Sequence, residues 1–259
     1  MAANTATKAA NGYRIDPPQA EGDGGIVAKA RVYLQPIAAP APFGLFGFFG
    51  STMVLATWML GWWSFHGTTA VAGFFLFNAA MGGLVQFAAG LWSFKARDYI
   101  ASALLTMWGT YWMAWGILQG LGVGGIVTIP SLSTSQPGFA VWFIPLGIAT
   151  FTGSLAALSP KHGNFPLFAL LFTIGVGSLI LSVGLWSGNL TWTHIAAYLF
   201  IAGAICAWYV GAMVILQSSW RKIILPLGKY GRAGNIPGSK SEYPTQYEHG
   251  HPGVRQGML

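Results

Sequence analysis

Charged side chains are scarce in this sequence. They make up 7% of its 259 residues, whereas hydrophobic residues make up 54%. Soluble globular domains carry about 25% charged residues, and a soluble fold of this size has too much surface to hide so much apolar side chain. Lipid must therefore be the solvent for most of the chain. Glycine (36 residues) and tryptophan (12 residues) are abundant, which is typical of membrane helices and of their interfaces.

Asp, Glu, Lys, Arg and His are missing from the interior of the long apolar stretches. His66, His162 and His194 lie in loops or at the ends of these stretches, and the single cysteine, Cys206, excludes a disulfide within the chain. Pumps and many proton-coupled carriers use a buried carboxylate relay, and this chain has none. Acid–base pairs and metal sites have no candidates either, so we expect neither an enzyme nor a bound metal or cofactor.

The net charge of +7 does not indicate a nucleic-acid partner. Phosphate recognition requires basic residues gathered on one solvated face, whereas here they occur in short clusters beside hydrophobic runs, which is typical of the cytoplasmic side of a membrane. Residues 1–40 are polar and contain no short apolar run with a cleavage site. A signal peptide is therefore not expected.

Three stretches without charged residues organise the chain, between Arg31 and Lys95, between Asp98 and Lys161, and between Lys161 and Arg221. A transmembrane helix needs roughly 20 apolar residues, so each stretch can hold two helices separated by a polar or glycine-rich break. The sequence predicts an all-α integral membrane protein with six transmembrane helices. These are expected at about 43–63, 70–94, 99–119, 139–158, 166–186 and 192–217.

Basic residues alternate along the predicted loops. They occur in the N-terminal tail, in the loops after the second and fourth spans, and in the C-terminal tail, whereas the other three loops have none. The positive-inside rule then places both termini in the cytoplasm of a multi-pass protein of the cell membrane. We expect a cytoplasmic N-terminal tail over 1–40, a six-helix domain over 41–220 and a cytoplasmic C-terminal tail over 221–259. Both tails have the composition of disordered segments.

An internal repeat is visible in the apolar region. The first and fourth spans share a Pro, Gly, Phe, Gly, Ser pattern with equal spacing, beginning at Pro42 and at Pro145, and GLWS ends both the second and the fifth span. A three-span unit used twice inverts its second copy in the membrane, and such 3+3 inverted repeats are common in transporters. Chance matching is the alternative in a chain so rich in glycine.

Neutral polar residues are the remaining candidates for a path through the membrane. The spacing of four residues puts Ser102, Thr106 and Thr110 on one helix face, and Asn78, Gly82 and Gln86 on another. Facing stripes of this kind would line a narrow, uncharged, hydrogen-bonding path. The plainer interpretation is that the hydroxyls bond to their own helix carbonyls and that the amides hold helices together. A face of Gly203, Ala207 and Gly211 in the last span predicts close helix packing.

Four segments resemble the acetate uptake transporter family, the acetate/succinate permeases of bacteria and fungi. APAPFGLFGF (39–48) resembles the family's NPAPLGL signature, and GGLVQFAAGLWSFK (82–95) is similar to its second-span segment. TMWGTYW (106–112) is similar to the third-span pattern S/T-x-Y-G-x-F-W, and KIILPLG (222–228) to the R-x-x-L-P-x-G tail. The signature residues are Pro40, Pro42, Gly44 and Leu45. The sequence departs from the family at Ala39, where the signature has Asn, and at Trp108, where the pattern has Tyr.

The resemblance implies six helices per protomer, a homo-hexamer, and proton-linked uptake of acetate and related short-chain monocarboxylates, with succinate as a further substrate. It also implies a hydrophobic constriction in each protomer, formed here by Phe48, Trp108 and Ile174. From the residues themselves, we predict that the substrate contacts neutral donors along the path. These are Ser51, Thr52, Asn78, Gln86 and Thr106. In the sharpest form of this prediction, Gln86, Ser51 and Thr52 face one another across the path and hold the carboxylate part-way through.

Two other functions remain open at this stage. A passive channel for small anions or neutral solutes would use the same polar stripes without a coupled cycle. A membrane receptor or assembly protein could carry a vestigial pore. Desolvating a carboxylate costs several kcal/mol, and protonating it at pH 7 costs roughly 3.7 kcal/mol for a pKa near 4.3. Because these costs are similar, the sequence leaves open whether an anion with a proton or the intact acid crosses.

Overall fold

The chain folds into a bundle of long helices. A computed structural model describes residues 38–63, 74–96, 98–159, 163–220 and 222–229, all within one compact unit, Leu34–Leu259. The second long rod, Phe74–Lys95, contains a π-helical segment, η1. The described elements are α1 (Ala41–Met59), η1 (Asn78–Val85), α3 (Gln86–Lys95), α4 (Tyr99–Val123), α5 (Pro137–Ala156), α6 (Phe165–Ser187) and α7 (Leu190–Trp220).

Six long helices in the described residues correspond to the six predicted spans, with ends that differ by a few residues. Five of them are long and apolar enough to cross a bilayer; α4 is not among these. The α4 helix has 25 residues but carries several Trp and Tyr side chains, whose polar atoms reduce its mean hydropathy. The predicted break at 64–69 and the start of the second predicted span lie outside the described residues.

Local sequence signals explain where the helices begin and end. The carboxylate of Asp98 accepts a hydrogen bond from the backbone N–H of Ala101 at 2.9 Å and caps α4, and Asn164 caps α6 in the same way through Leu167. Such caps satisfy backbone donors that a helix leaves free at its start. Gly188 ends α6 with a φ of 67°, a left-handed conformation that glycine adopts without strain.

Close helix packing depends on glycine in both halves of the bundle. A Cβ at Gly109 of α4 would lie 2.5 Å from the backbone nitrogen of Phe87, and one at Gly175 of α6 would lie 2.8 Å from that of Phe151. Neighbouring helices therefore approach to backbone contact. The predicted small-residue face of α7 is confirmed, because Gly203 abuts α6 and Gly211 abuts Phe46 of α1.

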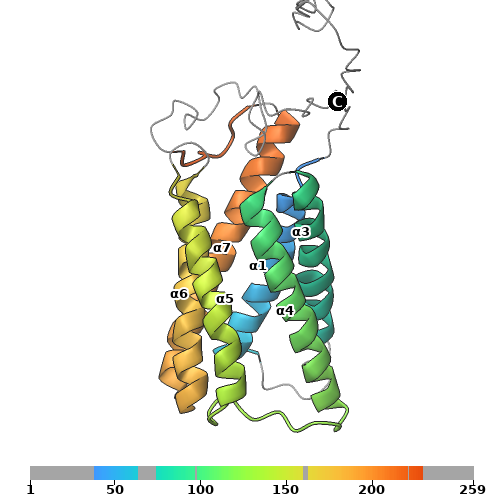
Figure 1. Cartoon of the computed structure of the whole chain (residues 1–259), viewed down its shortest axis with the longest axis vertical. Coiled ribbons are helices and arrows are strands. Elements are labelled where there is room, and N and C mark those ends of the chain that lie inside the picture. The colour runs from blue at the N-terminus through green and yellow to red at the C-terminus, as the bar shows by residue number, and fades with distance from the viewer. Residues whose placement is uncertain (1–37, 64–73, 97, 160–162, 221, 230–259) are drawn as a thin grey trace, which may run out of the picture. The chain divides into compact units, whose positions relative to one another are not determined.

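The two copies of the Pro–Gly–Phe pattern occupy different places in their helices. Pro42 is the second residue of α1, whereas Pro145 lies inside α5. The GLWS segments do correspond, since both stand in the last turns of their helices, α3 and α6. Helices α1 and α5 run in opposite directions (Figure 1). The inverted arrangement thus has support from helix order and from GLWS, but not from the register of the proline pattern.

The first residues after α7 pack against the bundle. Ile223 and Leu227 are buried, the N–H of Phe165 donates to the carbonyl of Gly228 at 2.9 Å, and the Tyr209 hydroxyl donates to the Pro226 carbonyl at 2.9 Å. The beginning of the predicted C-terminal tail is therefore held at the start of α6. The rest of that tail, and residues 1–37 of the N-terminal tail, lie outside the described residues.

Candidate functional site

A small cavity lies inside the bundle towards the end where α1 begins, and we call it the upper cavity, as oriented in Figure 1. Its volume is about 30 Å³. By a measure in which one water needs about 10–15 Å³, this is room for a solute of very few heavy atoms. It is lined by residues of five helices: Leu45, Phe48, Gln86, Leu104, Leu105, Trp108, Thr150, Leu170, Leu171 and Ile174.

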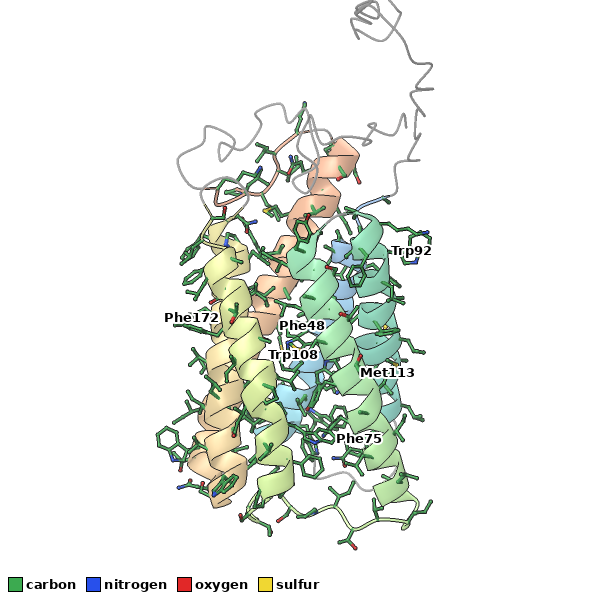
Figure 2. All side chains as sticks on the ribbon, viewed as in Figure 1. Phe48, Phe75, Trp92, Trp108, Met113 and Phe172 are labelled. Atoms are coloured by element: carbon green, nitrogen blue, oxygen red, sulfur yellow. The ribbon has the colours of Figure 1, made fainter. Side chains whose placement is uncertain are left out.

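All three residues of the predicted constriction line the upper cavity. The rings of Phe48 and Trp108 meet edge to face with centroids 5.8 Å apart, and Figure 2 shows them in the interior at mid-height. The indole N–H of Trp108 donates to the Thr150 hydroxyl at 3.0 Å, which ties the ring to α5. Ile174 is 1% exposed and is backed by Gly203 of α7, where a Cβ would lie 2.5 Å from its Cδ1. The structure thus brings these residues together.

Gln86 is the main polar group of the upper cavity. Its side chain is fully buried, and neither its amide nitrogen nor its amide oxygen has a hydrogen-bond partner among the described residues. The other polar lining residue, Thr150, is already engaged, because it donates to the Leu146 carbonyl at 2.7 Å and accepts from Trp108. A buried amide without partners costs about 1–3 kcal/mol. Its hydrogen-bonding capacity is therefore available to a solute in the cavity.

A second cavity, the lower cavity, lies towards the other end of the bundle and has a volume of about 50 Å³. Its walls include Leu55 and Met59 of α1, Tyr111 and Trp115 of α4, and Leu181 of α6. Helices α1, α4, α5 and α6 therefore line both cavities, whereas α3 lines only the upper one. The Gln119 side chain also lines the lower cavity, and so does Gln136, whose amide nitrogen donates to the Ser131 carbonyl at 2.7 Å.

One face of α1 runs past both cavities. On α1, Leu45, Phe48, Thr52, Leu55 and Met59 follow one another at steps of three and four residues and share a face. Leu45 and Phe48 line the upper cavity, and Leu55 and Met59 line the lower one. Thr52, 3% exposed, therefore lies between the two cavities. Along α1, the upper cavity is therefore followed by a closed segment at Thr52 and then by the lower cavity.

Unpaired polar groups gather in the first three helical rods. Five buried side chains there have at least one polar atom without a hydrogen-bond partner in the part of the chain that the structure describes, and we call them the unpaired polar set. They are Thr52, Asn78, Gln86, Tyr111 and Trp112. Native proteins pair the large majority of such atoms with protein or water. Two of the five, Gln86 and Tyr111, line the cavities, so polar atoms with unused hydrogen-bonding capacity stand at both.

The structure brings the predicted donors together only in part. Gln86 lines the upper cavity and Thr52 lies beside it on the cavity face. Ser51 instead turns towards η1, where a Cβ at Gly82 would lie 2.8 Å from its oxygen, and its hydroxyl donates to the Gly47 carbonyl at 2.8 Å. Asn78 is fully buried in η1 but lines neither cavity.

The predicted hydroxyl stripe of α4 does not face the cavities. Thr106 packs against Gly90 of α3, and its hydroxyl donates to the Ser102 carbonyl at 2.5 Å. Thr110 is exposed and donates to the Thr106 carbonyl at 2.8 Å. These hydroxyls therefore bond to carbonyls of their own helix, as the plainer interpretation of the sequence has it. The face of α4 that lines the cavities is Leu104, Trp108, Tyr111, Trp115 and Gln119.

The signature segment positions α1. The carbonyl of Pro40 accepts hydrogen bonds from the N–H groups of Phe43 and Gly44, and Pro42 lies in the first turn. A Cβ at Gly44 would lie 2.6 Å from Leu105 and 2.8 Å from Ala89, so this residue seats α1 against α3 and α4. Of the four signature residues, Leu45 reaches the upper cavity.

Tyr111 is the site residue that the sequence analysis missed. It lies three residues after Trp108 and seven after Leu104, so the helical period puts all three on one face. Counting one helical turn on from Trp108 along the sequence would have pointed to Tyr111. The regular hydroxyl spacing of Ser102, Thr106 and Thr110 pointed to a different face.

Comparison with known proteins gives three kinds of match. The profile described as the GPR1/FUN34/yaaH family matches residues 25–228. Ammonia transport outward protein 2 of Saccharomyces cerevisiae is 31% identical over 66% of this chain, and the match spans only 59% of that relative's length. The succinate-acetate/proton symporter SatP of Escherichia coli K12 is 24% identical over 74% of this chain and 96% of its own.

A solved structure, described as the bacterial acetate channel SatP, has a similar fold. The TM-score is 0.65 with 23% sequence identity, covering 74% of this chain and 100% of the other. At this identity the likeness concerns the fold alone.

Proposed function

Because the chain is a multi-pass membrane protein of the GPR1/FUN34/yaaH family, we propose that it carries acetate and related short-chain monocarboxylates across the cell membrane together with protons. The names of similar proteins support this substrate class, since SatP of Escherichia coli is described as a succinate-acetate/proton symporter. Proton linkage, uptake as the direction and succinate as a further substrate are parts of this proposal.

The observation that carries the proposal is the Gln86 amide in the upper cavity. It is an unpaired, fully buried, neutral hydrogen-bonding group in a small and otherwise apolar space. A carboxylate has two acceptor oxygens and a carboxylic acid has an acceptor and a donor, so an amide can bind either form. The small volume favours a solute the size of acetate over longer acids.

The free energies allow such a solute to pass without a cation in the site. Desolvating a carboxylate costs several kcal/mol, and each hydrogen bond to a charged group returns about 1.5–3 kcal/mol. Gln86 and Thr52 are the proposed source of these bonds. The other predicted donors, Ser51, Asn78 and Thr106, line neither cavity, and the hydroxyls of Ser51 and Thr106 already donate to helix carbonyls. Phe48, Trp108 and Ile174 are the proposed constriction, which excludes water and larger solutes.

We further propose six transmembrane helices, with α4 as the sixth, both termini in the cytoplasm, a 3+3 inverted repeat and a homo-hexameric assembly. At 1.5 Å per residue, the 25 residues of α4 span about 38 Å, which exceeds the roughly 30 Å of a bilayer core. The alternation of basic loops supports the orientation. Large side chains on the outside of the bundle, among them Leu84, Trp92 and Trp208, are exposed and leave apolar surface for lipid and neighbouring protomers.

A passive channel for small anions or neutral solutes is the second candidate. Within residues 41–220 the sequence carries charge only at Lys95, Arg97, Asp98 and Lys161, and the first three flank the end of α3. A path without a carboxylate, a histidine or a basic side chain offers no relay of that kind for a proton. The proton would then travel with the substrate, or no coupling would exist.

Flux of labelled acetate into liposomes containing the purified protein tests the proposal. We expect saturable acetate uptake that increases when an inward proton gradient is imposed. Acetate uptake that follows the acetate gradient and does not depend on the proton gradient would identify the passive channel. Liposomes that take up no acetate, while the protein in them remains folded, would contradict both candidates.

A further inference from the structure

Tyr111 lies in a different cavity from Gln86. Its ring lines the lower cavity, whereas Gln86 lines the upper one. Trp108 lines the upper cavity together with Gln86 and lies three residues before Tyr111 on the same face of α4, and its ring meets that of Tyr111 edge to face at 5.4 Å between centroids. Gln86 and Tyr111 therefore stand at successive cavities along the bundle.

The hydroxyl of Tyr111 makes no hydrogen bond to any residue that the structure describes. The residue is 6% exposed, and the oxygen is buried without a hydrogen-bond partner among the described residues. The tyrosine hydroxyl usually finds a partner when the ring is buried, and an orphaned one costs about as much as a lost hydrogen bond. A phenylalanine would fill the same space without this cost, so the hydroxyl calls for an external partner.

Aromatic neighbours fix the ring of Tyr111. It packs edge to face on Trp108, on Trp112 with centroids 5.3 Å apart, on Phe143 at 5.3 Å and on Trp142 at 6.4 Å. A ring held on several sides cannot swing its hydroxyl elsewhere. The donor is thus preorganised, which lowers the entropy lost when it binds a solute.

The polar atom of Trp108, its indole N–H, is not available to bind a solute that passes the ring. The indole N–H of Trp108 is committed to the Thr150 hydroxyl at 3.0 Å. A carboxylate that leaves Gln86 and passes Trp108 therefore needs a new donor at once, in the lower cavity. Gln136 there already donates to the Ser131 carbonyl. Trp115 and Gln119 also line the lower cavity, but they lie seven and eleven residues after Trp108 on α4, whereas Tyr111 lies three residues after it. Tyr111 is therefore the donor of α4 nearest to Trp108 in the lower cavity.

We propose that the Tyr111 hydroxyl is a specificity-determining donor that receives a small carboxylate on the lower side of Trp108, so that the substrate is passed between two neutral donors across an apolar gate. The proposal rests on the proposed function and deepens it. The phenol donates its proton to a hydrogen bond with a carboxylate oxygen, and no covalent bond changes. Selection for a carboxylate over an apolar solute of the same size is the expected result.

Labelled acetate uptake into liposomes by the Tyr111→Phe variant tests this role. The change removes one oxygen and keeps the ring packing. We expect the half-saturation concentration for acetate to rise about tenfold, equivalent to about 1.4 kcal/mol, with the maximal rate and thermal stability close to those of the wild type. Tyr209→Phe is the matched control, because its hydroxyl donates to Pro226 instead, and it should leave the half-saturation concentration unchanged.

The outcomes separate the two proposals. If the wild type transports acetate and Tyr111→Phe keeps the wild-type half-saturation concentration, the donor role is wrong and the proposed function stands. If the wild type transports no acetate, the proposed function itself fails. A Tyr111→Phe variant that loses its fold would also overturn the donor role, because a hydroxyl that binds only a passing solute stabilises nothing in the empty protein.

Discussion

The first three helical rods and the last three are built alike but treat their buried polar groups differently. In α1, η1–α3 and α4, five buried side chains form the unpaired polar set. Buried serines of this half, Ser51, Ser93 and Ser102, do donate to carbonyls of their own helices. In α5, α6 and α7, the buried hydroxyls are engaged as well. Thr150, Ser154, Ser178, Ser182 and Thr193 each donate to a backbone carbonyl.

The difference assigns separate tasks to the two halves. Unpaired groups lower stability and are kept where something outside the protein binds them. A hydroxyl that donates to a carbonyl of its own helix has no hydrogen left to donate to a solute. Under the proposed function, the first half supplies the hydrogen bonds of the path, and the second half supplies an apolar wall whose position is fixed by close packing, as at Gly203 behind Ile174.

Opening the gate that both halves build should have the largest effect. Phe48→Ala and Trp108→Ala each remove a ring from the upper cavity, at a cost of about 3–5 kcal/mol in stability. An apolar pocket discriminates one methylene by about 10–200-fold, so we expect uptake of butyrate relative to acetate to rise by at least about tenfold. Competition between labelled acetate and longer acids measures this.

Phe172→Ala is the control for the gate, since that ring lies on the outer side of α6 and is 41% exposed (Figure 2). It should keep the wild-type size limit. If Phe48→Ala and Trp108→Ala keep it too, these residues do not form the gate.

The second-largest effect is expected from adding a methyl group behind Ile174. Gly203→Ala places a methyl group where Ile174 Cδ1 is 2.5 Å away, and overpacking of this kind costs about 1–3 kcal/mol. We expect slower acetate uptake and a lower thermal midpoint, both partly restored by adding Ile174→Val. The control Gly138→Ala meets open space. A double variant no better than Gly203→Ala alone would contradict the role of Gly203 in positioning Ile174.

Removing one hydroxyl from each half sharpens the comparison further. Thr52→Val takes a member of the unpaired polar set from between the cavities, and Ser178→Ala removes a hydroxyl that already donates to the Ile174 carbonyl at 2.8 Å. A net hydrogen bond contributes about 0.5–1.5 kcal/mol, so Thr52→Val should raise the half-saturation concentration about two- to tenfold. Ser178→Ala should leave it nearly unchanged. Equal effects would remove the distinction between the halves.

The smallest expected effect is a change of stability with pH, which arises from Asp98 just before α4. Burial raises the pKa of the Asp98 carboxyl above its usual 3.8, and hydrogen bonds from the N–H groups of Ala101 and Ile100 oppose this. A raised folded-state pKa means that stability falls as pH rises from the unfolded pKa through the folded one. Asp98→Asn keeps the helix cap and removes this dependence. Thermal midpoints in detergent across that range should therefore decline more in the wild type than in the variant.

Much of the fold could be predicted from the sequence, because transmembrane helices leave long apolar stretches and charged residues mark their ends. Grouping Phe48, Trp108 and Ile174 depended on the family resemblance, since nothing in their spacing links three different helices. Gln86 was found through its type, as an amide beside glycines. Ser51 and Thr106 were placed on the path because a hydroxyl's partner cannot be read from spacing, and both bond to their own helix carbonyls. The π-helical turn of η1 also changed which face Asn78 presents relative to Gln86.

The most direct test of the account compares acetate affinity and assembly in the Gln86→Leu variant and the wild type. Leucine keeps the approximate volume and removes the amide, so the account predicts a half-saturation concentration ten- to hundredfold higher, from the loss of about 1.5–3 kcal/mol. Oligomer size and thermal midpoint, measured on the same purified sample, should match the wild type. Normal acetate affinity together with a damaged assembly would contradict the account, because Gln86 would then serve only to hold helices together.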